Sequence, residues 1–316
     1  VSNFNTENVT IMNQMFQNCS SLTSLDVSNF NTENVTNMSQ MFQNCTSLTT
    51  APVLSVKNMA DYCYYQMFCN CSSLASAPAL PATTLSNGCY SGMFDGCTSL
   101  ITAPELPATT LAANCYHYMF YGCSSLPKIT VPVSIKSIGN NAFYICRGLT
   151  SVTIPNSVTT IGISAFDDCR GLTSVTIPNS VTSIGSSAFR SCRSLTTLTF
   201  NAINCNNFGS TGHPFGVCPI STIVIGDSVQ HIPTGFSYGN SYLTSVTIGN
   251  SVSSIGDNAF RNCSRLTSVT IPNSVANIGS NAFYRCSGLT TLIFNAINCN
   301  DFNSRYDHAF DACPIS

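Results

Sequence analysis

The 316-residue chain carries a net charge of −2, and charged side chains make up only 8% of it. It contains no run of Lys and Arg, so the sequence offers no electrostatic footprint for nucleic acid or for an anionic membrane surface. No apolar run approaches the roughly 18 residues of a membrane-spanning helix, and we expect no transmembrane segment in this sequence. Ser, Thr and Asn are abundant, which predicts a largely neutral, hydroxyl-rich surface.

The first part of the chain repeats every 26 residues, and each copy closes with a Met-Phe-x-x-Cys turn. The anchor cysteines of these five copies are Cys19, Cys45, Cys71, Cys97 and Cys123. Self-similarity at a fixed period indicates a stacked repeat, in which each coil buries its apolar side against its neighbours. The chain begins within a copy, since Val1 to Phe4 match Val27 to Phe30. We therefore expect any signal or anchor segment to lie outside this sequence.

A second column accompanies the anchors in the third to fifth copies, where a Cys-Tyr pair precedes the methionine of the turn. The pairs are Cys63-Tyr64, Cys89-Tyr90 and Cys115-Tyr116. Each tyrosine lies four residues before a phenylalanine, a spacing that favours a half-buried position on one side of a helical turn. Tyrosine is also a rigid amphipathic contact residue, so this aromatic column is a candidate anchor for a partner protein or a sugar ring.

Beyond residue 127 the repeat shortens to 23 residues, and residues 149–169 form its clearest copy. Alternating apolar and polar residues predict a short strand that ends at Pro155, because proline cannot donate to a β-ladder. A second extended piece leads to Gly162, which can turn the chain. We then expect Ser164 to be the N-cap of one helical turn, because serine is a favoured residue at that position. Residues able to cap a helix recur at the equivalent positions, Asn141, Ser187, Asn258 and Asn281.

Two longer coils interrupt this spacing, near residues 196–218 and 290–313, and Asn240 replaces the anchor cysteine of one coil. Thirteen anchors result. We predict a repeat solenoid of α/β type, a stack of about thirteen coils with a parallel β-sheet face and short helical turns opposite.

The unit Leu-x-x-Val-x-Ile-Pro-x-x-Val-x-x-Ile-Gly-x-x-Ala-Phe-x-x-Cys closely resembles the BspA-like leucine-rich repeat of bacterial and protozoan surface proteins. The match covers residues 127–316. The Leu-Asp-Val-Ser-Asn-Phe-Asn-Thr coils of residues 1–126 resemble surface-protein repeats that are often joined to that type. The resemblance implies a right-handed leucine-rich-repeat solenoid, export to the cell surface, and a role in adhesion or host-protein binding. We expect one continuous domain over residues 1–316.

Eighteen cysteines require a choice among disulfides, metal binding and packing. Twelve of them are anchor cysteines, and neighbouring anchors lie one coil apart. We expect the distance between their Cβ atoms to exceed the ~3.8 Å that a disulfide prefers. We expect free thiols that hydrogen-bond a turn, as the Asn/Cys position of leucine-rich repeats allows. The pairs best placed for disulfides are Cys205 with Cys218 and Cys299 with Cys313. No cysteine spacing suits zinc, and we expect no metal.

Catalytic chemistry has little support in the sequence. His213 and His308 occupy matching places in the two long coils, four coils apart, so they cannot share a metal or a proton and we interpret them as loop residues. Asp and Glu are scattered, with no pair placed for acid and base work. Gly-x-Ser-x-Gly and phosphate-binding glycine loops are absent. We expect neither enzymatic activity nor a cofactor.

The strand face presents files of Ser and Thr that suit a protein or glycan ligand, the usual use of a solenoid's sheet surface. β-Propensity and solubility explain the same residues equally well. The residues are Ser151, Thr153, Ser174, Thr176, Thr197, Thr199, Ser245, Thr247, Ser268 and Thr270.

A basic edge is the remaining candidate surface. Arg147, Arg170 and Arg193 each follow an anchor cysteine in successive coils. The nearby acids, Asp167 and Asp168, lie in one coil only, so charge compensation is expected to be incomplete. The edge is a candidate for acidic glycans or proteins through bidentate arginine contacts, and the alternative is a solvated edge that keeps the coils soluble.

The resemblance implies a secreted or surface-anchored adhesin-like protein, and together with the residue patterns it leads us to expect that the protein recognises a protein or glycan and performs no chemistry. The alternative is a structural spacer that holds another domain away from the cell.

Overall fold

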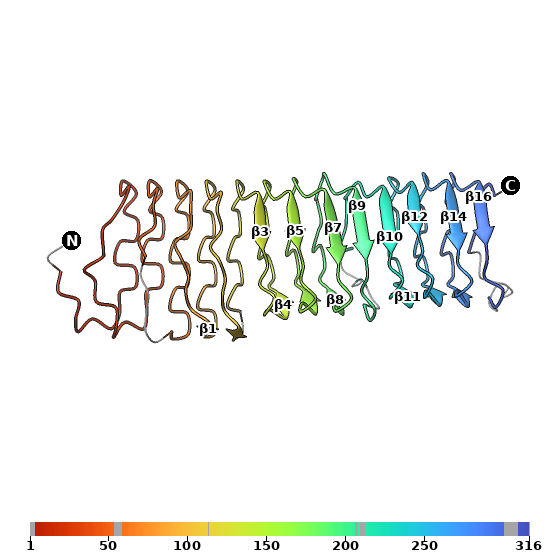
Figure 1. Ribbon diagram of the computed structural model, residues 1–316. Coiled ribbons are helices and arrows are strands. Elements are labelled where there is room, and N and C mark those ends of the chain that lie inside the picture. The colour runs from red at the N-terminus through yellow and green to blue at the C-terminus, as the bar shows by residue number, and fades with distance from the viewer. Residues whose placement is uncertain are drawn as a thin grey trace. The chain divides into compact units, whose positions relative to one another are not determined.

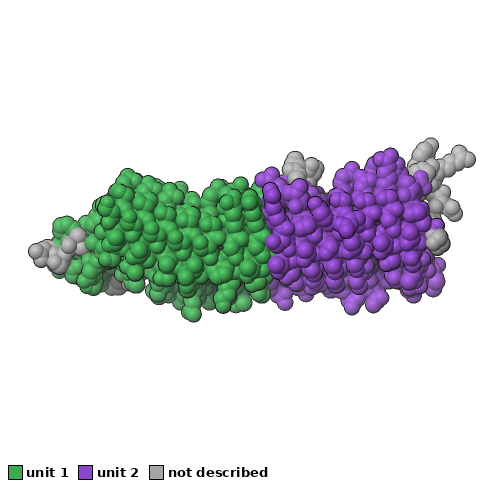
Figure 2. Space-filling view, turned by 90° about the horizontal axis from the view of Figure 1, so that it is seen from above, with its two compact units in different colours: residues 1–153, 162–172 green, residues 154–161, 173–316 purple. Residues whose placement is uncertain are grey.

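The computed structural model describes residues 4–53, 59–112, 114–205, 208, 213–299 and 309–315. Its contacts divide the chain into two compact units: unit 1 comprises residues 1–153 and 162–172, and unit 2 comprises residues 154–161 and 173–316 (Figure 2). Within each unit the chain winds in successive coils that stack side by side (Figure 1). A single continuous domain over the whole chain stays a prediction.

Short β-strands make up the regular secondary structure of the described residues. Unit 1 contains β1 (Thr84–Leu85), β2 (Thr110–Leu111), β3 (Lys128–Thr130), β4 (Ser137–Ile138) and β5 (Ser151–Thr153). Unit 2 contains β6 (Thr160–Ile161), β7 (Ser174–Ile177), β8 (Ser183–Ile184), β9 (Thr197–Phe200), β10 (Thr222–Ile225), β11 (His231–Ile232), β12 (Ser245–Thr247), β13 (Ser254–Ile255), β14 (Ser268–Ile271), β15 (Asn277–Ile278) and β16 (Thr291–Phe294).

The strand pairs within each unit are parallel and in register from one coil to the next. In unit 1, β1 pairs with β2 and β3 pairs with β5. In unit 2, one sheet has the order β7-β9-β10-β12, a second has the order β11-β13-β15, and two further pairs are β6 with β8 and β14 with β16. Strand β7 shows why these segments extend: Val175 and Ile177 are buried while Ser174 and Thr176 are exposed. This is the period of two that the sequence predicts.

The strands of the described residues amount to about nine turns of a parallel β-solenoid, so the predicted count of thirteen coils is wrong. That count came from the anchors, but several 26-residue coils pair only through isolated bridges, such as Thr50 with Ser76. A proline occupies the same position relative to the anchor cysteine in three of these coils, namely Pro52, Pro78 and Pro104. In the 23-residue coil the strand residue Thr176 occupies that position. Since proline has no N–H to donate, a ladder cannot extend through it.

The predicted helical turns opposite the sheet are absent from the described residues, in which no helix occurs. In the segments expected to be helical, successive backbone N–H groups donate alternately to the next coil and to a residue of their own coil. Tyr64 and Phe68 donate to the next coil, to the carbonyl oxygens of Cys89 and Met93, both at 3.0 Å. Met67, between them, donates back to Tyr64 of its own coil at 3.2 Å. An α-helix would satisfy all of these groups internally, so stacking takes the place of helix formation.

The residues expected to cap helices take a left-handed backbone conformation instead. Their φ angles lie between 50° and 58° at Asn141, Ser164, Ser187, Asn258 and Asn281. A second left-handed position follows four residues later, directly before the anchor cysteine, for example at Asn70 (φ 59°) and Asn262 (φ 62°). Glycine and asparagine adopt this conformation most readily. The segment is therefore a run of tight four-residue turns.

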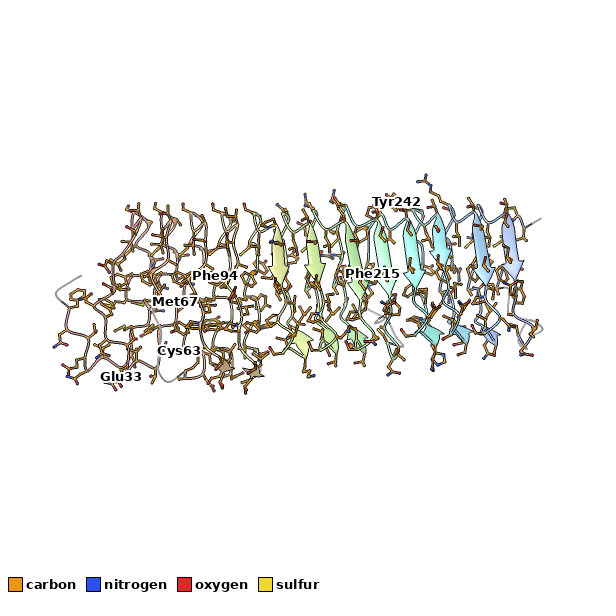
Figure 3. The ribbon with its side chains drawn as sticks, in the orientation of Figure 1. Glu33, Cys63, Met67, Phe94, Phe215 and Tyr242 are labelled. Atoms are coloured by element: carbon orange, nitrogen blue, oxygen red, sulfur yellow. The ribbon has the colours of Figure 1, made fainter. Side chains whose placement is uncertain are left out.

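Aromatic rings fill the interior of the coils. In unit 1, Phe42, Phe68, Phe94 and Phe120 are buried and stack face to face, with successive centroids 5.5, 5.9 and 5.8 Å apart. Met67 lies in the same interior, where it is 1% exposed (Figure 3). Stacked copies of one residue bury the apolar side that a single coil would leave in water.

The anchor thiols tie each coil to the one before it. Sγ of Cys97 donates to the carbonyl oxygen of Phe68 at 3.1 Å, and Cys146 makes the same contact with Phe120 at 3.0 Å. This confirms the expectation of thiols that hydrogen-bond a turn. None of the eighteen cysteines, all of which lie in the described ranges, forms a disulfide. The two candidate disulfides, Cys205 with Cys218 and Cys299 with Cys313, are therefore not formed.

Candidate functional site

The stack of phenylalanine rings in unit 2 is interrupted at Phe236. Phe189 and Phe215 stack face to face with their centroids 5.2 Å apart, as in unit 1. Phe236 instead meets Phe260 edge-on at 6.1 Å. The long coil also brings in Phe208, which stacks on Phe236 at 5.3 Å. The regular packing of one ring on the next is lost here, and a hollow opens.

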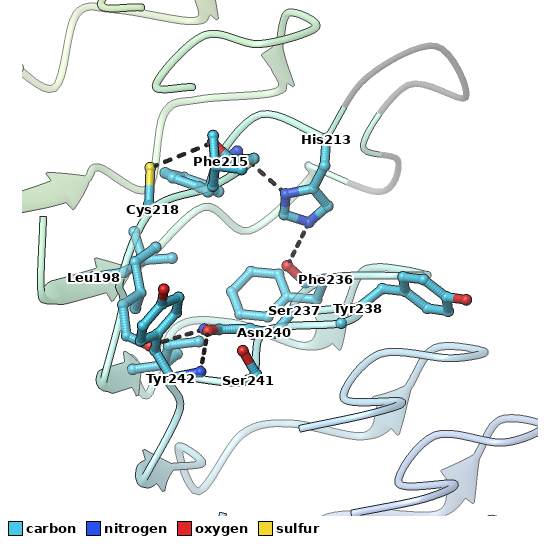
Figure 4. A pocket seen from close by; sticks show the side chains of 15 residues that line it. Leu198, His213, Phe215, Cys218, Phe236, Ser237, Tyr238, Asn240, Ser241 and Tyr242 are labelled. Atoms are coloured by element: carbon cyan, nitrogen blue, oxygen red, sulfur yellow. Dashed lines mark hydrogen bonds between the residues drawn. The ribbon is translucent and has the colours of Figure 1, made fainter. Parts of the chain in front are cut away.

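This hollow is a pocket of about 270 Å³, which we call the tyrosine-rimmed pocket (Figure 4). Its buried apolar lining consists of Leu198, Phe215, Ile220, Ile223 and Phe236. The remaining lining comes from residues 216–218 and 237–242, together with His213. An apolar cavity of about 150 Å³ admits benzene. The pocket is therefore large enough for an aromatic or branched aliphatic side chain.

His213 joins the long coil to the next coil along one wall of the pocket. Its Nε2 lies 3.1 Å from the carbonyl oxygen of Gly235 and 2.9 Å from that of Phe236, and its Nδ1 accepts from the N–H of Phe215 at 3.2 Å. Carbonyl oxygens only accept, so Nε2 carries the proton. Burial lowers the pKa of His213 below its usual value, although the two carbonyl contacts act in the opposite direction. The matching His308 lies outside the described residues.

Asn240, in the place of an anchor cysteine, forms the opposite wall. Its Nδ2 donates to the carbonyl oxygen of Ile220 at 2.8 Å and to Oγ of Ser237 at 3.3 Å. Its Oδ1 accepts from the N–H of Tyr242 at 3.0 Å. An amide can serve three partners at once, whereas a thiol has one weak donor. The sequence showed that Asn240 would hydrogen-bond a turn, but it did not reveal that the residue shapes a pocket.

The mouth of the pocket is amphipathic. Tyr238 and Tyr242 are 52% and 50% exposed, and Val217 is 75% exposed. The described lining holds no carboxylate, lysine or arginine, and the imidazole of His213 is engaged by backbone groups. Such a site can bind an apolar group and hydrogen-bond its surroundings through the phenols. It offers no pair of groups for acid and base chemistry.

The Ser and Thr files of the strand face lie where the sequence predicts. In unit 1, Ser151 and Thr153 are exposed on β5. In unit 2, Ser174 pairs with Thr197, and Thr222 pairs with both Thr197 and Ser245. The other predicted residues of this face in unit 2 are Thr176, Thr199, Thr247, Ser268 and Thr270. Ligand binding by the face stays a prediction.

The basic edge is more compensated than the sequence suggests. In unit 1, Nε of Arg147 and Nε of Arg170 lie 2.9 and 2.7 Å from the two carboxylate oxygens of Asp168. Burial would raise the pKa of Asp168, but the hydrogen bonds from the two arginines outweigh it and the pKa is lowered. Asp167, the other expected partner, is buried at 1% exposure. Arg193 lies in unit 2 and is exposed.

The aromatic column is part of the interior of unit 1. Tyr64 and Tyr90 are 4% and 2% exposed, and Tyr116 is half-buried. Their rings stack, with centroids 5.6 Å apart for Tyr64 and Tyr90 and 6.4 Å apart for Tyr90 and Tyr116. This burial favours the structural interpretation over a binding role.

Metal and membrane sites were also considered. Across the described ranges, no three His, Cys, Asp or Glu side chains are grouped so that they could hold a metal ion. No helix in the same ranges is long and apolar enough to cross a bilayer.

The family model of the BspA type leucine rich repeat region matches residues 113–236 and 234–316, in six copies. A second family model, for a Mycoplasma protein of unknown function, DUF285, matches residues 1–80. No curated protein matches the chain.

Among solved structures, a leucine-rich repeat protein from Bacteroides ovatus ATCC 8483 is similar, with a TM-score of 0.53 and 21% identity, covering 97% of this chain and 92% of that chain. A leucine-rich repeat protein from Eubacterium ventriosum ATCC 27560 has a TM-score of 0.46 and 20% identity, covering 88% of this chain and 82% of that chain. The first shares the fold of stacked coils. Because the BspA type model spans more than half of the residues, the chain belongs to the BspA type leucine-rich-repeat family.

Proposed function

We propose that this protein is a non-enzymatic binding protein of a bacterial cell surface, and that its tyrosine-rimmed pocket receives an apolar side chain of a partner protein. The observation that carries the proposal is the pocket itself, about 270 Å³ with a buried apolar lining. Tyr238 and Tyr242 stand half-exposed at its mouth. Rigid aromatic residues around a pocket that excludes water are typical of the energetic centre of a protein interface.

Membership of the BspA type family supports the location at the surface, since the repeat resembles that of exported surface proteins. The low charge of the chain supports binding through shape and apolar contact rather than through a broad electrostatic field. The lining of the pocket supports a binding role without catalysis. Both ring nitrogens of His213 are hydrogen-bonded to backbone groups, Nε2 to two carbonyl oxygens and Nδ1 to one N–H, and neither faces a second titratable group.

The sheet face is our second candidate surface. Its Ser and Thr residues are aligned in exposed files, as in β7 and β12. A hydroxyl-rich parallel sheet suits a glycan or an extended protein surface. A spacer without any ligand is the third possibility, and the experiment below separates the three.

The test measures binding of the purified protein to immobilised extracellular matrix proteins and glycans by surface plasmon resonance. Ser241→Phe places a ring at the mouth of the pocket, at an exposed position. Ser20→Phe makes the same change at the equivalent exposed position of a coil in unit 1 and is the matched control. We expect a protein ligand to bind at least about tenfold more weakly to Ser241→Phe, with Ser20→Phe unchanged.

Two results would contradict the proposal. If Ser241→Phe and Ser20→Phe both bind the ligand as tightly as the wild type does, the binding site would be assigned to the sheet face instead of the pocket. No binding to any member of the array would favour the spacer.

A further inference from the structure

A cluster of aromatic and cationic side chains lies beside the tyrosine-rimmed pocket in unit 2. Tyr238, Arg261 and Tyr284 occupy one repeat position in successive coils, 23 residues apart, and Arg285 follows Tyr284. The guanidinium carbon of Arg261 lies 5.9 Å from the ring centroid of Tyr238 and 4.9 Å from that of Tyr284. The guanidinium carbon of Arg285 lies 5.1 Å from the same Tyr284 ring. We call these four residues the arginine–tyrosine cluster.

Among the described residues, aromatic rings rather than carboxylates contact these two arginines. Nη1 of Arg261 donates to Oδ1 of Asn258 at 3.1 Å, and its buried Nε has no hydrogen-bond partner among the described residues. Neither Arg261 nor Arg285 forms an ion pair with a carboxylate of the described ranges. Arg147 and Arg170 of unit 1 differ, because Asp168 bridges both.

Among the residues that the structure describes, this arrangement leaves positive charge without its complement. Both guanidinium groups lie over the ring of Tyr284, so the two like charges repel one another. The cation–π contacts fix the groups in place, which lowers the entropy lost when an anion binds. A carboxylate that reaches either guanidinium group would relieve the repulsion and form charge-assisted hydrogen bonds.

Tyr238 links the cluster to the pocket, because the residue is part of the pocket lining and its ring contacts Arg261. A ligand that fills the pocket with an apolar group can therefore bring an acidic group to Arg261. We propose that pocket and cluster form one composite site for an acidic segment of a partner protein, in which an aromatic anchor is followed by Asp or Glu. The inference rests on the proposed function of the pocket and adds the charge of the partner.

A polypeptide fits the composite site better than a sulfated glycan does. The buried lining of Leu198, Ile220, Ile223 and Phe236 gains free energy only from an apolar group. A sulfated sugar offers anions but no group to fill this lining. An acidic segment with one aromatic residue offers both within a few residues.

The test uses two synthetic peptides, acetyl-Gly-Trp-Gly-Glu-Glu-Glu-Gly-amide and the same peptide with Gln in place of Glu. The protein has no tryptophan, so indole fluorescence reports on the peptide alone. We expect the acidic peptide to bind about fivefold or more tightly than the neutral one at low salt, with the difference lost at about 1 M salt. Arg261→Gln removes the difference.

Two variants serve as controls. Arg265→Gln removes the same charge from an exposed arginine of the same coil that contacts no ring in the described structure, and it keeps the difference between the peptides. Arg285→Gln acts at an exposed position, so it tests the cluster even if Arg261→Gln fails to fold. It is expected to reduce the difference as well.

The outcomes separate the cluster from the pocket. Equal affinity for both peptides, abolished by Ser241→Phe, would overturn the composite site and leave the pocket standing. No binding of either peptide would overturn both. Heparin-derived oligosaccharide that binds more tightly than the acidic peptide, with loss in Arg261→Gln, would overturn the assignment to an acidic protein segment.

Discussion

Sγ of Cys97 lies 3.1 Å from the carbonyl oxygen of Phe68, one coil earlier in the chain. Both residues are fully buried, and the same carbonyl oxygen also accepts from the N–H of Cys71 at 3.1 Å. The thiol therefore supplies the second hydrogen bond to a carbonyl group that water cannot reach. The same contact recurs between Cys71 and Phe42, also at 3.1 Å. The anchor cysteine is therefore a hydrogen-bond donor between coils as well as an apolar filler.

Cys97→Ala should lower the free energy of unfolding by about 1–3 kcal/mol, because it leaves a small cavity and removes one of the two hydrogen bonds to the buried carbonyl of Phe68. Urea denaturation monitored by circular dichroism measures the change. Cys19 occupies the same repeat position but is exposed, so Cys19→Ala should cost less than about 0.5 kcal/mol. Equal losses in the two variants would count against a role of burial in the thiol contact.

Native protein should react slowly with thiol reagents at most of its cysteines. Burial raises the pKa of Cys45 and of Cys205 to about 11 and that of Cys146 to about 12, so little thiolate is present at pH 8. Cys19 is exposed and should be alkylated first, which peptide mapping by mass spectrometry can show. In denaturant without reductant, all eighteen thiols should react. A smaller number would reveal disulfides.

Asp168→Asn should destabilise the protein by about 1 kcal/mol at neutral pH, since one carboxylate pairs with Arg147 and Arg170 at the surface. Asparagine suits the φ of 60° at this position, so the change removes charge without backbone strain. The pKa of Asp168 is lowered in the folded state from its ordinary 3.8, so its contribution is complete above that value and is lost as pH falls through the folded pKa. Unfolding free energies of wild type and variant should converge in acid. A constant difference down to about pH 2 would argue against the ion pairs.

Val217→Asn should raise the free energy of unfolding by about 1 kcal/mol, because a β-branched residue is strained at a φ of 55°. Val217 is 75% exposed, so little apolar burial is lost. Asn262 holds the equivalent position with a φ of 62°, and Asn262→Val should cost a similar amount. Thermal unfolding of both variants checks the pair, and no gain for Val217→Asn would show that the surrounding turn relaxes the strain.

The repeat period predicted the stacking of coils, the columns of phenylalanine and cysteine, and the exposed Ser and Thr of the strands. It did not distinguish a helix cap from a left-handed turn, because Ser164 and Asn141 are favourable residue types for both. The choice depends on where the backbone N–H groups donate, and half of them donate to a neighbouring coil. That information is absent from any single repeat.

The pocket and the cluster depend on side-chain orientation. Asn240 marked an irregular coil, but the pocket is also lined by Phe236, whose edge-on ring orientation the repeat pattern does not predict. Arg261 and Tyr284 share a repeat position, yet only their rotamers place the guanidinium over the ring. The sequence named Asp168 as a candidate partner of the arginines, but it did not reveal that this one carboxylate bridges Arg147 and Arg170.

The alternation of backbone donors has a genetic consequence. Each regular coil receives from its predecessor the same set of hydrogen bonds that it passes to its successor, so two coils of equal length are interchangeable partners. Duplication of one complete 23-residue segment between equivalent positions, for example within residues 241–286, would preserve the pattern of hydrogen bonds between coils. A deletion of a few residues would break the pairing along the whole perimeter of a coil. We therefore expect unequal recombination between such segments to be tolerated only when it adds or removes whole repeats. The coding sequence can then change length by whole repeats while the irregular coils that form the pocket stay unchanged.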